Sequence, residues 1–242
     1  MRYGVISDIH SNLEALEAVL SALAREGVNL LLCCGDIVGY AADPAACVEL
    51  VRRKVNAGVG GNHDWAAAGK LDMDWFNPQA RLAVAWTVTR LSEDQKKFLG
   101  SLPLTWRDEN VTLVHGSLDQ PEEFPYIFDL SEAQASLKLQ ETLVGFMGHT
   151  HLPGFFTAQE ASGSYEPAQG IYRLKAGVKV LVNVGSVGQP RDRDPRAAYC
   201  LYDSDEKTIE IRRVAYPFER TQEKIRAAGL PGVLADRLAA GY

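Results

Sequence analysis

The first sixty residues alternate between uninterrupted apolar runs of strand length and stretches of helical periodicity. Residues 3–7 and 30–34 are runs typical of strands buried on both faces, as in a parallel sheet. Between them, apolar side chains recur at intervals of three and four, at Leu13, Leu16, Val19, Leu20 and Leu23. A second helix from Asp43-Pro44 to about Val55 precedes a third short strand at Val59. This order of elements predicts a parallel sheet built from βαβ units.

The middle of the chain is mainly helical in its pattern. Helices are expected from Asn77-Pro78 to about Leu91, from the capping box Ser92-Glu93-Asp94-Gln95, and from a cap at Ser131 to about Gln140. Strands are expected near residues 104–106, 111–114 and 144–147. We therefore expect a helical insert at about residues 64–100.

Short alternating or apolar runs dominate the last third of the chain. They lie at residues 155–157, 170–173, 180–184, 197–202 and 208–214, separated by Gly, Pro and charged turns. This pattern predicts a second, mainly antiparallel sheet, followed by helices near residues 218–228 and 232–240. We expect a single α/β domain over residues 1–242, a two-sheet sandwich flanked by helices in the order αββα.

The amino-acid composition indicates which partners to expect more clearly than it indicates the fold. The net charge is −6 and the sequence lacks basic clusters, so a nucleic-acid partner is not expected. No apolar run is long enough to span a bilayer, and the N-terminal segment becomes polar by Asp8, which is unlike a secretory signal. We expect a cytoplasmic protein without a membrane partner, while homo-oligomerisation stays open.

The four cysteines do not form a metal-binding pattern. Cys33 and Cys34 are adjacent in a predicted strand and so point to opposite faces, and no C-x-x-C pair joins them to Cys47 or Cys200. We interpret all four as reduced and buried side chains.

Asp and His residues follow the predicted strands at the points where the strands end. Asp8-Ile9-His10 follows the first strand, Gly35-Asp36 the second, and residues 60–64, which read Gly-Gly-Asn-His-Asp, the third. His115 and Gly148-His149-Thr150-His151 follow two later strands, so each of the five histidines lies at a strand end. Because ligands of open α/β sheets bind at the carboxyl ends of strands, we expect these clusters to converge.

This ordered set of motifs resembles the calcineurin-like metallophosphoesterase superfamily, in its branch of small bacterial and archaeal phosphodiesterase-like members. The motifs that carry the resemblance are Asp8-x-His10, Gly35-Asp36, Gly61-Asn62-His63-Asp64, His115 and Gly148-His149-x-His151. Residues 183–191 also resemble small bacterial members. The resemblance implies a hydrolase with two divalent metal ions.

The same resemblance implies a role for each site residue. One ion would be held by Asp8, His10 and His151, and the other by Asn62, His115 and His149. Asp36 would bridge the two ions and is counted with the catalytic residues. His63 would face the phosphate, as proton donor to the leaving oxygen or as hydrogen-bond donor to the transition state.

The donor types agree with a binuclear centre. Two neighbouring divalent ions need a bridging anion, and a carboxylate such as Asp36 supplies one. Asp8 and Asp36 offset two of the four positive charges, which leaves a net charge that attracts phosphate and stabilises a bridging hydroxide. Mixed imidazole, carboxylate and amide ligands suit Mn or Fe, with Zn, Ni or Co as alternatives, and do not suit Ca or Mg alone.

One departure separates the chain from the protein phosphatases of the superfamily. Those enzymes continue the second motif as G-D-x-V-D-R-G, whereas this chain continues it as Ile37-Val38-Gly39-Tyr40. The second Asp, which orients the catalytic His, and the phosphate-gripping Arg are therefore absent from the motif. Asp43 and Asp64 are candidates for orienting His63.

Several residues keep two interpretations open. Asn12 is either the cap of the first helix or a contact to the substrate phosphate, and Asp64 is either a helix cap or an active-site residue. Residues 191–196 are interpreted as a solvated, self-paired loop, except that Arg191 is a candidate phosphate clamp. Trp75-Phe76 either packs the helical insert, which we favour, or lines a pocket for a ring.

The expected function is hydrolysis of phosphodiester or phosphomonoester bonds of a small or nucleotide substrate by metal-bound hydroxide. Dinucleoside polyphosphate hydrolysis, nuclease activity and a non-catalytic metal-binding scaffold remain alternatives. The acidic balance disfavours a nuclease, and the complete ligand set together with His63 disfavours a scaffold.

Overall fold

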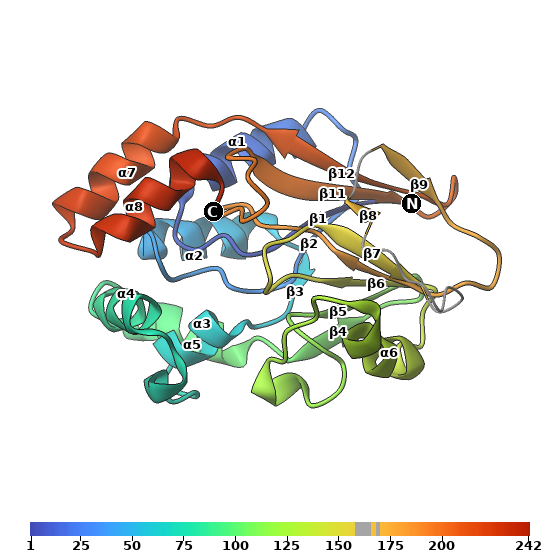
Figure 1. Cartoon of the computed structure of the whole chain (residues 1–242), viewed down its shortest axis with the longest axis horizontal. Helices are drawn as coiled ribbons and strands as arrows, with labels where there is room; N and C mark the ends of the chain where they lie inside the picture. Colours follow the sequence, from blue (N-terminus) through green and yellow to red (C-terminus); the bar gives the residue numbers. More distant parts are fainter. Residues whose placement is uncertain (158–165, 168–169) are drawn as a thin grey trace.

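Two six-stranded sheets pack face to face in the computed structural model, which describes residues 1–157, 166–167 and 170–242 (Figure 1). The first sheet has the strand order β3 (Ala57–Gly58), β2 (Leu30–Cys33), β1 (Arg2–Ile6), β11 (Ala197–Asp203), β12 (Thr208–Val214) and β9 (Ile171–Arg173). The second has the order β4 (Thr105–Arg107), β5 (Val111–Val114), β6 (Val144–Met147), β10 (Val180–Asn183), β7 (Gly154–Thr157) and β8 (Glu166–Pro167).

Helices cover the outer faces of this sandwich. In chain order the helices are α1 (Leu13–Leu23), α2 (Pro44–Lys54), α3 (Asn62–Ala67), α4 (Pro78–Val88), α5 (Glu93–Ser101), α6 (Leu130–Leu139), α7 (Phe218–Ala227) and α8 (Gly232–Ala240). Two short 3₁₀ helices, η1 (Met73–Trp75) and η2 (Pro121–Glu123), lie between them. Figure 1 shows α7 and α8 side by side at the end of the molecule opposite β9. The predicted αββα sandwich is confirmed.

The alternation of strand side chains separates the core into layers. Ile6 and Cys33 face α1 and α2 in one apolar cluster. Val5, Leu32 and Cys34 belong to another cluster, together with Phe146 and Val182 of the second sheet, and this cluster fills the space between the sheets. Cys33 and Cys34 therefore point to opposite faces, and all four cysteines are free and buried, as predicted.

The prediction that the last third forms its own antiparallel sheet is wrong. β11 pairs antiparallel with β1, so the first sheet gains β11, β12 and β9. β10 pairs parallel with β6 and antiparallel with β7, so these strands belong to the second sheet. Local alternation identifies strands, but their partners are set by contacts between distant parts of the chain.

Some element ends also differ from the prediction. The helix expected to reach Leu91 ends at Val88, and the strand expected at Val59 ends at Gly58. The cap of α6 is Asp129 rather than Ser131, because the Asp129 carboxylate accepts from the backbone N–H of Glu132 in a reciprocal capping box.

The range from about 64 to 100 contains α3, η1, α4 and α5, while the helical insert and the single-domain interpretation stay predictions. Among the residues described, no helix has both the length and the apolarity required to cross a bilayer.

Candidate metal centre

The polar clusters converge at the carboxyl ends of parallel strands from both sheets. β1, β2 and β3 run parallel in the first sheet, and β5, β6 and β10 run parallel in the second. Backbone bonds join the loops that follow them: Asp8 N–H donates to Gly35 O at 2.9 Å, and Gly188 N–H donates to Asp8 O at 2.9 Å. The convergence expected from the sequence is therefore observed.

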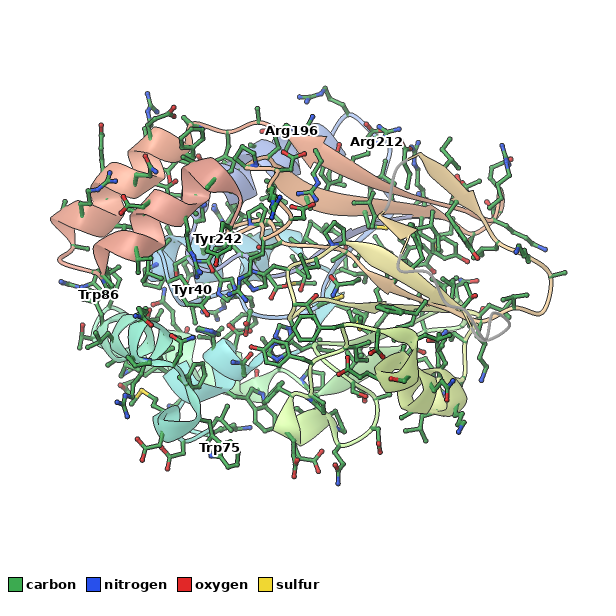
Figure 2. The ribbon with its side chains drawn as sticks, viewed as in Figure 1. Tyr40, Trp75, Trp86, Arg196, Arg212 and Tyr242 are labelled. Carbon is green, nitrogen blue, oxygen red and sulfur yellow. The ribbon has the colours of Figure 1, made fainter. Side chains whose placement is uncertain are left out.

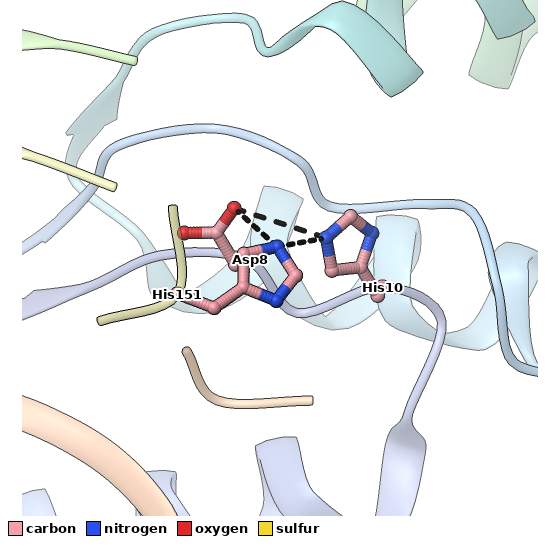
Figure 3. A group of neighbouring side chains, drawn as sticks. All are labelled: Asp8, His10 and His151. Carbon is pink, nitrogen blue, oxygen red and sulfur yellow. Dashed lines mark hydrogen bonds and ion pairs between the residues drawn. The ribbon is translucent and has the colours of Figure 1, made fainter. Parts of the chain in front are cut away.

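Asp8, His10 and His151 form the first group of potential ligands (Figure 3). Nε2 of His10 and Nε2 of His151 lie 3.0 Å apart, and Nε2 of His151 lies 3.3 Å from Oδ1 of Asp8. All three side chains are buried, with relative exposures of 0% to 2%. These donor atoms point at one another closely enough to surround a single ion.

Asp36, His115 and His149 form the second group. Nε2 of His115 lies 3.0 Å from Nδ1 of His149 and 3.3 Å from Oδ2 of Asp36. The same Oδ2 atom lies 3.6 Å from Nε2 of His10 in the first group. Asp36 is therefore the carboxylate that faces both groups, in the position expected of a bridge.

Backbone carbonyls fix the orientation of the imidazoles. Nδ1–H of His10 donates to Val38 O at 3.1 Å, and Nδ1–H of His151 donates to Gln189 O at 2.6 Å. Nδ1–H of His115 donates to Cys34 O at 2.7 Å. Each bond leaves Nε2 free to act as a ligand atom, which is the usual outer support of a metal-binding histidine.

Unsatisfied buried atoms provide a further test of whether the site fits metal ions. Oδ1 of Asn62 and Nε2 of His149 are buried and have no hydrogen-bond partner among the described residues. A buried polar atom without a partner is costly, so a ligand role accounts for Oδ1 of Asn62, whereas the His149 atom that faces the second group is Nδ1. The role of Asn62 as a ligand of the second group stays a prediction, while the donor types of both groups fit divalent metal ions.

The backbone at the centre is strained in a way that supports this interpretation. Asp8, His10, Asp36, His149 and His151 all have positive φ angles, between 49° and 69°. For residues other than glycine this left-handed conformation costs on the order of 1 kcal/mol each. Such strain persists where the surrounding structure requires it, and it concentrates at functional sites.

Burial and charge set the protonation states of the cluster. Burial lowers the pKa of His149 to about 3, so this imidazole is neutral at pH 7. Burial also lowers the pKa of His115, but the nearby charge of Asp36 raises it to about 9. Burial raises the pKa of Asp8, yet His151 more than offsets this and holds that pKa below its usual value. Metal binding at His115 is therefore expected to release a proton.

His63 lies beside the ligand groups rather than within either of the two that the sequence implied. Its imidazole packs edge-on against His10 at a centroid distance of 4.8 Å and against Phe76 at 4.9 Å. Its backbone N–H donates to Oδ1 of Asp36 at 2.9 Å. Burial lowers the pKa of His63 to about 4. Its ring nitrogens also approach Asp36 and His10 closely enough to form a third potential ligand group.

The order of these residues along the chain agrees with a known family model. The model of the calcineurin-like phosphoesterase superfamily domain matches residues 1–207. The chain belongs to this superfamily. Proteins of this superfamily typically bind divalent metal ions, and the two ligand groups lie inside the matched range.

Individual relatives resemble this member of the superfamily over nearly its whole length. An uncharacterized protein of Methanocaldococcus jannaschii is 40% identical over 241 residues, which cover 98% of this chain and 97% of the relative. The crystal structure of a metallophosphoesterase from Sphaerobacter thermophilus has a TM-score of 0.89 and 42% identity, and the match covers 100% and 99% of the two chains. A hypothetical protein of Pyrococcus horikoshii shares the fold, with a TM-score of 0.80, 20% identity and coverage of 100% and 98%.

Neither candidate for orienting His63 contacts its ring. The Asp64 carboxylate accepts from the backbone N–H groups of Gly61 at 3.1 Å and Ile37 at 2.9 Å, so it ties two metal-binding loops together. Burial and the charge of Asp36 raise the pKa of Asp64 to about 7. Asp43 instead pairs with Lys224 of α7 at 2.7 Å. Both orienting roles are therefore wrong, because these carboxylates are engaged elsewhere.

Asn12 is the cap of α1. Its Oδ1 accepts from Ala15 N–H at 3.1 Å and from the Thr221 hydroxyl at 3.0 Å. Its Nδ2 donates to Gly188 O at 2.8 Å and to the Tyr216 hydroxyl at 3.2 Å. These bonds use both donors and both acceptor positions of the side-chain amide, so we do not propose Asn12 as a substrate contact.

The loop of residues 191–196 is largely self-paired, with Arg191 as the exception. Arg196 pairs with Asp194 at 2.7 Å, and Asp192 pairs with Arg213 of β12. Arg191 instead donates to the Tyr40 hydroxyl at 3.3 Å, and its Nε is buried without a partner in the described part of the chain. Its role as a phosphate clamp stays a prediction.

A cavity of about 460 Å³ opens beside the second ligand group. Its lining includes His63, Asn62 and His149, and its aromatic walls include Tyr40, Trp75, Phe76, Phe124 and Tyr126. Trp75 is 85% exposed, so the interpretation that it packs the insert is wrong, whereas Phe76 both packs and lines the cavity. Sequence reasoning missed Tyr126, whose ring stacks on the His149 imidazole at 3.9 Å.

Proposed function

We propose that the chain is a phosphoesterase that uses two divalent metal ions to hydrolyse phosphodiester or phosphomonoester bonds of a small or nucleotide substrate. The observation that carries the proposal is the position of Asp36, whose Oδ2 faces His10 at 3.6 Å in one group and His115 at 3.3 Å in the other. Mn or Fe suits this donor set best, with Zn, Ni or Co as alternatives.

Bound ions would supply an activated water nucleophile and positive charge for the phosphoryl oxygens. Asp8, His10 and His151 would hold one ion, and Asn62, His115 and His149 the other, with Asp36 between them. His63 would donate a proton or a hydrogen bond to the leaving oxygen, since its ring lines the cavity next to Asn62 and His149.

The cavity supports a substrate with a flat apolar group. Its walls are mainly aromatic, and Glu122 and Glu123 are its only charged lining residues apart from histidine within the described chain. Aromatic walls favour a ring such as an aryl group or a nucleobase. The two carboxylates disfavour additional phosphates in the cavity, which weighs against nucleic acid and polyphosphate esters there.

Hydrolysis of p-nitrophenyl phosphate and of bis-p-nitrophenyl phosphate, with added Mn²⁺ and metal analysis of the purified protein, tests this function. Turnover of either ester, lost in the Asp36→Asn variant, is the expected result. A preparation that binds metal fully and hydrolyses neither ester would contradict the enzyme and favour the scaffold. The cytoplasmic location and homo-oligomerisation expected from the sequence stay predictions.

A further inference from the structure

Two guanidinium groups meet at one side-chain oxygen on the flank of the metal centre. Nη2 of Arg191 donates to Oε1 of Gln189 at 3.1 Å, and Nη1 of Arg237 donates to the same atom at 3.2 Å. Arg191 belongs to the loop after β10, whereas Arg237 lies in α8 near the end of the chain. Segments far apart in the sequence thus bring two positive charges together.

Neither guanidinium pairs with a carboxylate among the described residues. Arg226, another arginine of the α7–α8 pair, has such a partner in Asp236 at 2.7 Å. Nε of Arg191 and Nε of Arg237 are buried and lack hydrogen-bond partners in the described part of the chain. Burial and the charge of Arg191 lower the pKa of Arg237 below its usual value. Two like charges without a counterion are costly, so an anion would stabilise this arrangement.

The pair is linked to the metal centre through short contacts. The backbone oxygen of Gln189 accepts from Nδ1 of His151, a potential ligand, at 2.6 Å. The guanidinium of Arg191 lies 5.8 Å from the ring centroid of Tyr40, which in turn lies 4.5 Å from His10 and 4.6 Å from His63. In the view of Figure 2, the labelled Tyr40 lies below α8. Arg237 lies 6.0 Å from the ring of Tyr242.

The chemistry of the pair selects the type of anion. Guanidinium groups bind phosphoryl oxygens through parallel N–H bonds, and two of them match the charge of a phosphate dianion. Arg191 and Arg237 are positively charged, whereas the acidic groups that line the aromatic cavity are those of Glu122 and Glu123. Tyr40 lies at both places, because it lines the cavity and accepts from Arg191.

We propose that Arg191 and Arg237 form a phosphate-binding subsite beside the metal centre, with α8 supplying the second cation. The subsite rests on the proposed phosphoesterase function, and it names the residues that bind a phosphoryl group of the substrate outside the metal ligands. A substrate would then lie with its phosphoryl charge toward α8 and its ring toward Trp75 and Tyr126. The C-terminal helices become part of the binding site rather than only a cover.

Titration of the metal-loaded full chain with inorganic phosphate, followed by calorimetry, tests the subsite without requiring turnover. Arg191→Ala and Arg237→Ala are each expected to weaken phosphate binding by about tenfold or more, because each removes charge-assisted hydrogen bonds. Arg226→Ala is the matched control, because it removes a paired arginine from the same helix pair. Arg237→Gln removes the charge while keeping a polar side chain, in case the alanine variant does not fold.

The outcomes separate the subsite from the proposed function. Unchanged phosphate affinity in folded Arg237→Ala or Arg237→Gln, at equal metal content, overturns the subsite even if esters are hydrolysed. Arginine-dependent phosphate binding without ester hydrolysis supports the subsite and contradicts the enzyme. Pyrophosphate shows which phosphoryl group of the substrate the subsite binds. If the arginine variants lose more affinity for pyrophosphate than for phosphate, the subsite binds a second phosphoryl group. Equal losses of affinity assign the subsite to the reacting phosphoryl group.

Discussion

A β-carbon added to Gly39 would lie 2.4 Å from Nδ1 of His63, so the backbone of Gly39 packs directly against this imidazole. Nδ1 of His63 is buried and has no hydrogen-bond partner among the described residues. The protein phosphatases of the superfamily carry an Asp at the position of Gly39. In this chain, packing against Gly39, Tyr40 and Phe76 positions the ring in place of a carboxylate.

Gly39→Ala is therefore expected to displace His63 and reduce turnover without removing the metals. Misplacing a catalytic group by about 1 Å can cost roughly a hundredfold in rate. Gly27→Ala is the matched control: Gly27 also has a positive φ, of 64°, but an added β-carbon meets nothing within 4 Å. Both variants place a β-carbon at a positive φ, 102° at Gly39 and 64° at Gly27, so the control accounts for part of the backbone strain. Comparison of kcat for bis-p-nitrophenyl phosphate at equal metal content then tests the contact with His63. Equal kcat values in the two variants would contradict the positioning role.

His63→Ala is expected to lower kcat by about 10²- to 10⁴-fold, the usual contribution of a group that donates a proton in the transition state. The metal content of the variant, measured after gel filtration, is expected to match that of the unmodified protein. His149→Ala provides the contrast, because its imidazole belongs to the second ligand group and its loss should deplete metal. Loss of metal from His63→Ala would instead assign His63 to the third potential ligand group, with His10 and Asp36.

Asp36→Asn is expected to deplete both ions, because its Oδ2 faces both ligand groups. Ions that bind only the folded chain stabilise it by about 2.7 kcal/mol at a hundred times Kd, so Tm should fall in this variant and in unmodified protein treated with a chelator. Asp43→Asn is the control, since that carboxylate pairs with Lys224 and not with the centre. If a chelator lowers Tm of Asp36→Asn as much as that of the unmodified protein, Asp36 is not essential for metal retention.

Asn12→Ala separates a structural role from a substrate contact. The variant loses the cap of α1 and leaves Gly188 O and the Thr221 hydroxyl without their bonds to the amide. We expect a decrease of about 2 kcal/mol or more in the free energy of unfolding, measured with urea. KM of the folded fraction for p-nitrophenyl phosphate should stay unchanged. A selective rise in KM with normal stability would restore Asn12 as a substrate contact.

The ligand clusters could be predicted from the sequence because each lies directly after a short apolar strand. Asp8 and His10, for example, follow β1 in the chain and lie at its end in the structure. The pairing of β11 with β1 could not be predicted, since alternation along one strand does not specify its neighbour. Arg237 had no local signal either: an arginine in an amphipathic helix is ordinary until the fold brings it to Gln189.

Substitution of Trp75 tests how the cavity selects its substrate. Its side chain is 85% exposed and lines the cavity, so Trp75→Ala should change the free energy of unfolding by less than about 0.5 kcal/mol. Loss of ring stacking, worth about 0.5–1.5 kcal/mol, should raise KM for bis-p-nitrophenyl phosphate by roughly two- to tenfold, with kcat little changed. Leu82→Ala is the control, because Leu82 is also exposed, at 59%, and is not among the cavity-lining residues. Equal KM values for the two variants would show that the ring of the substrate binds elsewhere.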